Sequence, residues 1–215
     1  AIEAMRGKRG KATAAAFFAE MEEALPRLQD ELTSGTYRHG PYTYFPIFEP
    51  KQRLVAAAGF RDRVVHHALV RVIEPLLERR FIEDSFACRR GKGTHAGMRR
   101  AALFARGHRY ALKCDVRKYF PHIDHEVLVG LLGRVIGDRG VLELCRHILA
   151  SHRDGERYEV PPGGELFDLR TVGRGLPIGN LTSQFWANVY LNPLDHFVKH
   201  ELRCRGYVRY MDDFV

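Results

Sequence analysis

Two short stretches of the sequence place carboxylates among apolar residues, where an ionised acid is costly to bury. Asp115 follows Leu-Lys-Cys, and Asp212 and Asp213 stand side by side behind Tyr-Met near the end of the sequence. Each acid alone is best explained as a solvated turn or a helix cap. Both stretches have the character of strands, however, so the three acids are predicted at strand ends. If the two strands are neighbours, Asp115 and Asp212 face each other at one end of a sheet.

Close carboxylates of this kind favour a particular chemistry. Two ionised carboxylates about 4 Å apart repel by roughly 4 kcal/mol at an effective dielectric constant near 20. Such a site either protonates one acid or holds a cation, and Mg²⁺ accepts ligation by carboxylate oxygens while leaving positions for water and phosphate oxygens. Two such ions about 3.5–4 Å apart clamp the attacking and leaving oxygens of an in-line phosphoryl displacement. The three acids therefore indicate nucleotidyl transfer.

The strands that must position these acids are predicted over residues 109–120 and 206–215. In the first, Leu112, Cys114 and Val116 alternate with polar residues and are expected to share one buried face. In the second, a turn is expected at Met211-Asp212, so the sequence would stop inside a hairpin. Short strands are also predicted around Pro46 and Pro50.

Apolar residues at helical spacing predict the remaining elements. A helix capped by Asp62 is expected to carry the stripe Val65, Leu69, Val72, Ile73 and Leu76, and a helix capped by Asp124 is expected to end at Gly137. Further helices are expected over residues 11–34, after a basic loop at 88–100, up to residue 149, and over 183–202 with a bend at Pro193; residues 151–174 read as a hairpin or loop. Helices and strands mix without a regular βαβ rhythm, so the sequence predicts the α+β class.

Composition limits the classes of function. The 215 residues are 45% hydrophobic and carry a net charge of +8, which suits a polyanionic partner. No stretch approaches the apolar length that spans a bilayer, so no membrane partner is expected. Four scattered cysteines indicate a reducing cytosol rather than a disulfide framework. The spacings His122/His125 and His196/His200 could bind zinc, but without paired cysteines they read as surface or core histidines.

Three blocks of the sequence resemble the central palm motifs of reverse transcriptases, in their usual order: LKCDVRKYFPHIDH, GLPIGNLTSQFWANVYLNPLDHFVKHELR and YVRYMDDFV. Residues 50–100 resemble the fingers of bacterial, group-II-intron-like reverse transcriptases. Within that group, IGNLTSQ resembles the form found in diversity-generating retroelements. Most other families carry Gln before the Gly and Pro after the Ser, where this sequence has Ile178 and Gln184.

The resemblance implies a right-hand polymerase fold. Residues 1–108 would form an N-terminal extension and the fingers. Residues 109–215 would form the palm, with an RRM-like sheet and segments that return to the fingers, truncated after the Tyr-x-Asp-Asp hairpin turn and lacking the thumb.

The implied activity is RNA-directed DNA polymerisation with two Mg²⁺ ions, for which Mn²⁺ could substitute, and error-prone cDNA synthesis in a diversity-generating retroelement. The alternatives are a reverse transcriptase of a group II intron, a retron or a phage-defence system, and, from a different class, a non-catalytic RNA-binding scaffold. The intact acids argue against the scaffold, since a binder has no reason to keep uncompensated acids near phosphates.

Residue roles follow from the same resemblance. Asp115 and Asp212 would be metal ligands with the Val116 carbonyl, and Asp213 would be the lesser second acid. Phe120 would be a steric gate beneath the sugar 2′ position, while Gly179 and Ser183 would form a close turn that opens the helix beneath the nascent base pair. The residues expected to contact the incoming dNTP are Lys51, Arg53, Arg61, Phe120, Ile178, Gly179 and Gln184.

The expected partners are an RNA template, a DNA or RNA primer, dNTPs and a small basic accessory protein. The expected location is the cytoplasm, for a bacterial or phage-encoded protein.

Overall fold

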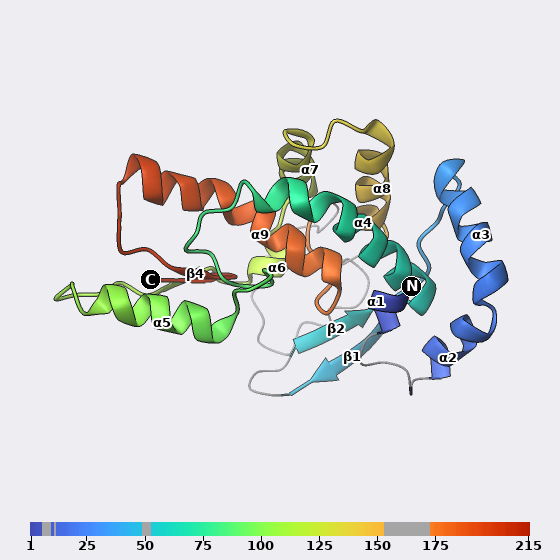
Figure 1. The fold of residues 1–215 in the computed structure, drawn as a ribbon, viewed down its shortest axis with the longest axis horizontal. Coiled ribbons are helices and arrows are strands. Elements are labelled where there is room, and N and C mark those ends of the chain that lie inside the picture. The colour runs from blue at the N-terminus through green and yellow to red at the C-terminus, as the bar shows by residue number, and fades with distance from the viewer. Residues whose placement is uncertain (6–9, 11, 49–52, 153–172) are drawn as a thin grey trace, which may run out of the picture.

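A computed structural model describes residues 1–5, 10, 12–48, 53–152 and 173–215 (Figure 1). Along these ranges helices alternate irregularly with two small antiparallel sheets, which confirms the α+β class. None of the helices described here is both long and apolar enough to cross a membrane.

The described N-terminal residues form α1 (Ile2–Met5), α2 (Ala12–Ala19) and α3 (Met21–Thr33), and the single helix predicted over 11–34 is divided into α2 and α3. The break falls at Glu20, whose ψ of 8° departs from helical geometry. The change of direction lets α2 and α3 bury different residues, Ala14 and Leu28. Phe17 of α2 packs on Phe60, with ring centroids 5.2 Å apart.

The first sheet is the hairpin of β1 (Thr43–Ile47) and β2 (Arg53–Ala57), with Pro46 of β1 opposite Leu54 of β2. This confirms a strand at Pro46, while Pro50 lies outside the described residues. The next helix, α4 (Phe60–Glu78), begins after Gly59, so the prediction that Asp62 caps it is wrong. Asp62 instead accepts hydrogen bonds from the Tyr37 hydroxyl at 2.8 Å and the Gly40 amide at 3.2 Å, and so anchors the segment before β1.

Four further helices follow: α5 (Thr94–Ala105), α6 (Tyr119–His122), α7 (His125–Gly133) and α8 (Arg139–Ala150). Asp124 caps α7 as predicted, accepting from the amides of Glu126 and Val127 at 3.0 and 3.2 Å. The helix ends at Gly133, four residues earlier than expected. The last helix, α9 (Leu181–His196), begins two residues before Ser183, contains Pro193, and continues as a π-helix over Phe197–Glu201.

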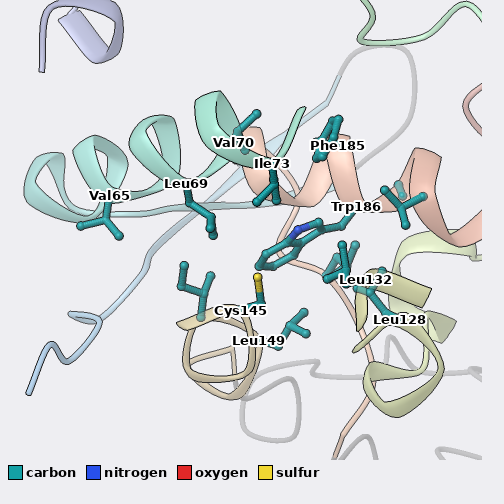
Figure 2. Packing of buried hydrophobic residues seen from close by; sticks show 14 of the residues in the cluster. Val65, Leu69, Val70, Ile73, Leu128, Leu132, Cys145, Leu149, Phe185 and Trp186 are labelled. Carbon is teal, nitrogen blue, oxygen red and sulfur yellow. The ribbon is translucent and has the colours of Figure 1, made fainter. Parts of the chain in front are cut away.

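The hydrophobic core lies where α4, α7, α8 and α9 meet around Trp186 of α9 (Figure 2). Ile73 comes from α4, Leu132 from α7 and Cys145 from α8. Two members of the predicted α4 stripe, Val72 and Leu76, are instead 62% and 45% exposed. The predicted stripe is wider than the buried face of α4, whose main neighbours are α9, α1 and α2.

The second sheet has three short strands, β3 (Cys114–Asp115), β4 (Arg209–Tyr210) and β5 (Asp213–Phe214), in the order β3-β5-β4. The two acid-bearing segments are therefore adjacent through β5, which follows the turn and is paired on both sides. Leu112 is 77% exposed, contrary to the predicted buried face, because the ladder begins only at Cys114. The turn at Met211-Asp212 is confirmed.

Candidate active site

The second sheet gathers three carboxylates at one end. Asp115 of β3 lies directly opposite Asp213 of β5, and the Val116 amide donates to the Asp212 carbonyl at 3.2 Å. The expectation that Asp115 and Asp212 would be direct partners across the ladder is wrong by one residue. All three acids still converge, because one ligand oxygen from each lies within 4.8 Å of the others.

The β4–β5 hairpin explains how two neighbouring acids reach the same site. Tyr210 pairs with Asp213, so Met211 and Asp212 form a two-residue turn. Met211 has a φ of 60°, in the left-handed region that residues with a Cβ rarely adopt. This turn places Asp212 at the tip of the hairpin and Asp213 in the ladder, so both carboxylates can approach Asp115.

The cluster fits a hard divalent cation. Its donors are carboxylate oxygens, which Mg²⁺ and Mn²⁺ prefer, and Asp115 is exposed while the other two acids are partly buried. An exposed ligand leaves room for water and for the phosphate oxygens of a substrate. Lys113 lies beside the cluster, with its ammonium 3.5 Å from Asp213 Oδ1, and both side chains are at least half exposed. Such a solvent-exposed pair is weak and can be displaced.

A second group of predicted residues lies where the β1–β2 hairpin meets the start of α9. The Ile178 carbonyl accepts from the Ala56 amide at 2.9 Å, which joins this segment to β2. Gly179 has a φ of 106°, and a Cβ there would stand 2.7 Å from Val55 Cγ1. The position therefore requires glycine both for its backbone conformation and for the close approach of β2. Gly179 thus lies in a close turn before the helix, as predicted, whereas Ser183 lies inside α9 and not in the turn.

Asn180 was missed by sequence reasoning. Its Nδ2 donates to the Ala56 carbonyl at 2.8 Å and to the Pro177 carbonyl at 3.2 Å, and its Oδ1 accepts from the Ala58 amide at 3.3 Å. It occupies the N-cap position of α9, yet its side chain holds β2 instead of capping the helix. An asparagine before a helix reads as an ordinary cap, so the sequence carried no signal for this role.

Phe120 and Gln184 lie near this junction. Phe120 is partly buried in α6, its carbonyl accepts from the Leu176 amide at 2.9 Å, and Leu176 belongs to the segment that carries Ile178. Gln184 is exposed in the first turn of α9 and its Oε1 lies 3.6 Å from Cys88 Sγ. Ser183 is fully buried, and its hydroxyl has no hydrogen-bond partner among the described residues.

Of the three basic residues expected at the triphosphate, only Arg61 has a side chain within the part of the chain that the structure describes. Arg61 forms a salt bridge with Glu31 of α3, donates to Asp62 and stacks over the Tyr37 ring at 5.0 Å. Arg53 is the first residue of β2 and pairs with Ile47 of β1 in the ladder. Lys51 lies outside the described residues.

Beneath the hairpin turn lies a buried arginine that sequence reasoning also missed. Arg209 and its partner Asp195 are both 0% exposed. An arginine between two apolar residues of a strand, as in Val-Arg-Tyr, is the signal that could have revealed it, because a buried guanidinium requires a carboxylate partner.

Comparison with known proteins adds an independent line of argument. A family model described as "Reverse transcriptase (RNA-dependent DNA polymerase)" matches residues 48–215, which is more than half of the chain. That range includes the carboxylate cluster and the junction of β2 with α9.

Several curated proteins are similar over long stretches. Protein YkfC of Escherichia coli (strain K12) is 29% identical over 200 residues, which cover 89% of this chain and 49% of that protein. The group II intron-encoded protein LtrA of Lactococcus lactis subsp. cremoris is 26% identical over 181 residues, covering 82% of this chain and 28% of that protein. Nuclear intron maturase 1, mitochondrial, of Arabidopsis thaliana is 36% identical over 90 residues, covering 42% and 13%. The chain thus spans half or less of the length of each of these relatives.

Proposed function

The chain belongs to the reverse transcriptase (RNA-dependent DNA polymerase) family, and we propose that it carries the nucleotidyl-transfer site of an enzyme that copies RNA into DNA. The observation that carries this proposal is the convergence of Asp115, Asp212 and Asp213, whose ligand oxygens lie within 4.8 Å of one another. The substrates would be an RNA template, a DNA or RNA primer and dNTPs.

In the proposed reaction the primer 3′-oxygen forms a bond to the α-phosphorus of the dNTP, and the bond to the bridging oxygen breaks to release pyrophosphate. Asp115, Asp212 and Asp213, with the Val116 carbonyl, would hold two Mg²⁺ ions, for which Mn²⁺ could substitute. Bound Mg²⁺ supplies positive charge that offsets the charge developing on the phosphoryl oxygens. The protein's own contribution is to hold the acids in place before substrate arrives, since positioning and electrostatics supply most of the catalysis in phosphoryl transfer.

We assign the β1–β2 hairpin and α4 to the fingers, within residues 1–108, and the three-stranded sheet to an RRM-like palm within residues 109–215. The junction of β2 with α9 supports this assignment, because Gly179 and Asn180 join the hairpin to the segment before α9, and the Leu176 amide of that segment donates to the Phe120 carbonyl. Phe120 would act as the sugar gate, and the dNTP contacts would come from Lys51, Arg53, Arg61, Ile178, Gly179 and Gln184.

For the class of enzyme we propose error-prone cDNA synthesis in a diversity-generating retroelement. Support comes from Ile178 and Gln184 in the block IGNLTSQ. A second candidate is an intron-encoded reverse transcriptase. It is favoured by the names of two relatives, a group II intron-encoded protein and a nuclear intron maturase. Reverse transcriptases of diversity-generating retroelements misincorporate chiefly opposite adenines of the template. A high error rate opposite adenine would therefore favour the first candidate, and a low rate would favour the second.

Primer extension tests the proposed function. In the full-length enzyme, Asp115→Asn and Asp212→Asn each remove a charged ligand without adding bulk, so extension on an RNA template should be abolished while RNA binding is largely retained. Glu143→Gln is a matched control, because Glu143 is an exposed acid that pairs with Arg146 on α8. Substantial extension by either aspartate variant would refute the assignment.

We also propose a cytoplasmic location and a small basic accessory protein as a further partner. The location is supported by four cysteines that are all free thiols in the described structure. Burial raises the pKa of the Cys145 thiol to about 12, so this cysteine is unreactive.

A further inference from the structure

Directly beneath the hairpin turn, a buried ion pair joins β4 to α9. Arg209 Nε donates to Asp195 Oδ1 at 2.7 Å and Nη2 donates to Oδ2 at 2.6 Å, which is a two-pronged contact. Both side chains are 0% exposed. Figure 1 shows the backbone that connects the two elements: after α9 and the π-helix that continues it, the chain returns along a loop to β4.

The remaining nitrogen of the guanidinium reaches the turn itself. Arg209 Nη1 donates to the Met211 carbonyl at 2.8 Å and to Asn188 Oδ1 at 3.0 Å. Met211 is the residue held in the left-handed conformation, and its carbonyl belongs to the peptide that precedes Asp212. The guanidinium therefore holds the peptide bond between Met211 and Asp212, which sets the direction of Asp212 in the turn and leads into Asp213 in the ladder.

Other contacts keep the guanidinium itself in place. The Tyr207 hydroxyl donates to Asp195 Oδ1 at 2.7 Å, and Asn188 Nδ2 donates to the Ala87 carbonyl at 2.6 Å. The Arg209 backbone is also bound on both sides, donating to the Asp84 carbonyl at 2.9 Å and accepting from the Phe86 amide at 3.0 Å. Arg209 thus has little freedom to move, and neither does the carbonyl it binds.

Stability alone is a weak explanation for this arrangement. The desolvation cost of a buried ion pair offsets much of its attraction, and well-packed apolar residues often stabilise a fold as well or better. An apolar pair, however, cannot donate a hydrogen bond to the Met211 carbonyl. The contact to the turn is the part of the arrangement that only a guanidinium held by a carboxylate supplies.

We infer that Arg209 is a positioning residue for divalent-metal binding, which acts by fixing the Met211 peptide and thereby the directions of Asp212 and Asp213. This inference rests on the proposed function, because it takes the three acids to be metal ligands. Residues that orient metal ligands from outside the coordination sphere typically change metal affinity by about 10- to 100-fold when they are replaced.

The first experiment compares Arg209→Lys with Arg89→Lys by titrating each protein with Mn²⁺ and following the free ion by electron paramagnetic resonance. Arg89 is a close structural match, because its side chain is 5% exposed, pairs with Glu78 and donates to the carbonyls of Ile82 and Ser85 rather than to the Met211 carbonyl. Since Ser85 forms a β-bridge with Arg209, this control also tests whether a disturbance of the segment next to Arg209 is enough to weaken metal binding. Lysine at 209 can still pair with Asp195 but cannot also reach the Met211 carbonyl in the same geometry. Arg209→Lys should weaken Mn²⁺ binding by about tenfold or more, whereas Arg89→Lys should retain wild-type affinity. Wild-type affinity in Arg209→Lys, or an equal loss in both variants, would overturn the inference.

A second variant separates positioning from stability. Arg209→Met with Asp195→Leu removes both buried charges together, so no uncompensated charge remains in the core. If the ion pair is merely structural, this double variant should bind Mn²⁺ as the wild type does once thermal unfolding shows it to be folded. The inference predicts instead that its Mn²⁺ affinity stays reduced by about tenfold or more, and that primer extension requires correspondingly more Mg²⁺. A full-length wild-type enzyme that binds Mn²⁺ but extends no primer would refute the proposed function while the Mn²⁺ comparison still tests Arg209.

Discussion

Asp213 of the cluster has a cation beside it. The Lys113 ammonium lies 3.5 Å from its Oδ1, so part of the charge that a metal would meet is already offset. Asp115, by contrast, comes from a separate strand and closes the cluster from the opposite side. The three acids are therefore not equivalent.

We predict that Asp213→Asn lowers primer extension less than Asp115→Asn or Asp212→Asn does. The resemblance to reverse transcriptases makes Asp213 the lesser ligand, and Lys113 offsets part of the attraction of its carboxylate for a cation. Single-turnover extension at several Mg²⁺ concentrations measures the difference. An Asp213→Asn enzyme as inactive as Asp115→Asn would show that all three acids contribute equally.

Phe120 is the residue to test for discrimination between sugars. Its ring is partly buried in α6, and its backbone is tied to Leu176, so a smaller side chain leaves a space without moving the backbone. Phe120→Val should admit ribonucleotides and lower the preference for deoxyribonucleotides by at least tenfold in kcat/KM. If the ratio of the two efficiencies stays at the wild-type value, the gate lies elsewhere.

Ile178 offers a test of fidelity, because its contact with β2 is made by the backbone carbonyl and survives a change of side chain. A glutamine side chain could hydrogen-bond the incoming nucleotide, which contributes roughly 0.5–1.5 kcal/mol and corresponds to about a 2- to 13-fold change in discrimination. Ile178→Gln should therefore make fewer errors opposite template adenine at similar speed. Sequencing cDNA from both enzymes on one RNA template gives the error rates. Equal rates would remove Ile178 from the mechanism, and low rates in both would count against the retroelement class.

At the scale of elements, α9 connects the two halves of the candidate site. Asn180 at its start holds β2, and Asp195 near its end holds Arg209 under the hairpin turn. Between them Trp186 anchors the helix in the core (Figure 2). The helix is therefore well placed to hold the junction of β2 with α9 at a fixed position relative to the three carboxylates.

Gly179→Ala tests the junction of β2 with α9. The new Cβ would lie 2.7 Å from Val55 Cγ1, and the φ of 106° is unfavourable for alanine. We expect a loss of roughly 1–3 kcal/mol in the free energy of unfolding, measured by urea denaturation. Adding Val55→Ala removes the atom that clashes but not the backbone strain, so it should recover only part of the loss. Full recovery would mean that the conformation costs nothing, and no recovery would mean that the contact with Val55 is unimportant.

The elements also show where sequence reasoning succeeds. Asp124 was recognised as a cap because capping depends on residues two or three positions away. Asp62 was misassigned because its partners, Tyr37 and Gly40, are more than twenty residues earlier in the chain. The convergence of the acids was predicted, yet the strand order β3-β5-β4 was not, since two-residue strands carry almost no periodic signal. Arg209 was missed because its partner Asp195 belongs to another element.

At the scale of the whole molecule, the excess of basic residues predicts how the protein binds nucleic acid. The chain carries a net charge of +8, and phosphate contacts release counterions. For as few as three phosphate contacts on single-stranded RNA, affinity should fall roughly 20-fold between about 50 and about 200 mM salt. Fluorescence anisotropy with a labelled RNA measures the slope, and heparin should compete. An affinity independent of salt would contradict an electrostatic interface.

A histidine in the interior of the protein stays neutral, and this makes the stability of the fold depend on pH. His66 of α4 is 1% exposed, its Nε2 lies 3.2 Å from His39 Nε2, and its Nδ1 has no hydrogen-bond partner among the described residues. Burial, followed by the neighbouring His39, His67 and Arg63, lowers the pKa of His66 from 6.5 to about 3. At mildly acidic pH, His66 is therefore protonated in the unfolded chain but not in the folded protein.

The sign of the pH dependence follows from this difference. Between pH 6.5 and about 3 the unfolded state binds a proton at His66 that the folded state does not, so stability falls as the pH is lowered through this window and is unaffected by His66 above it. The slope from this one group is about 1.4 kcal/mol per pH unit. His66→Leu should remove that slope between about pH 6 and about pH 4, measured by urea unfolding at each pH, while His95→Leu, which replaces an exposed histidine of α5, should keep it. If wild type and His66→Leu lose stability in parallel on acidification, acid sensitivity arises elsewhere in the fold.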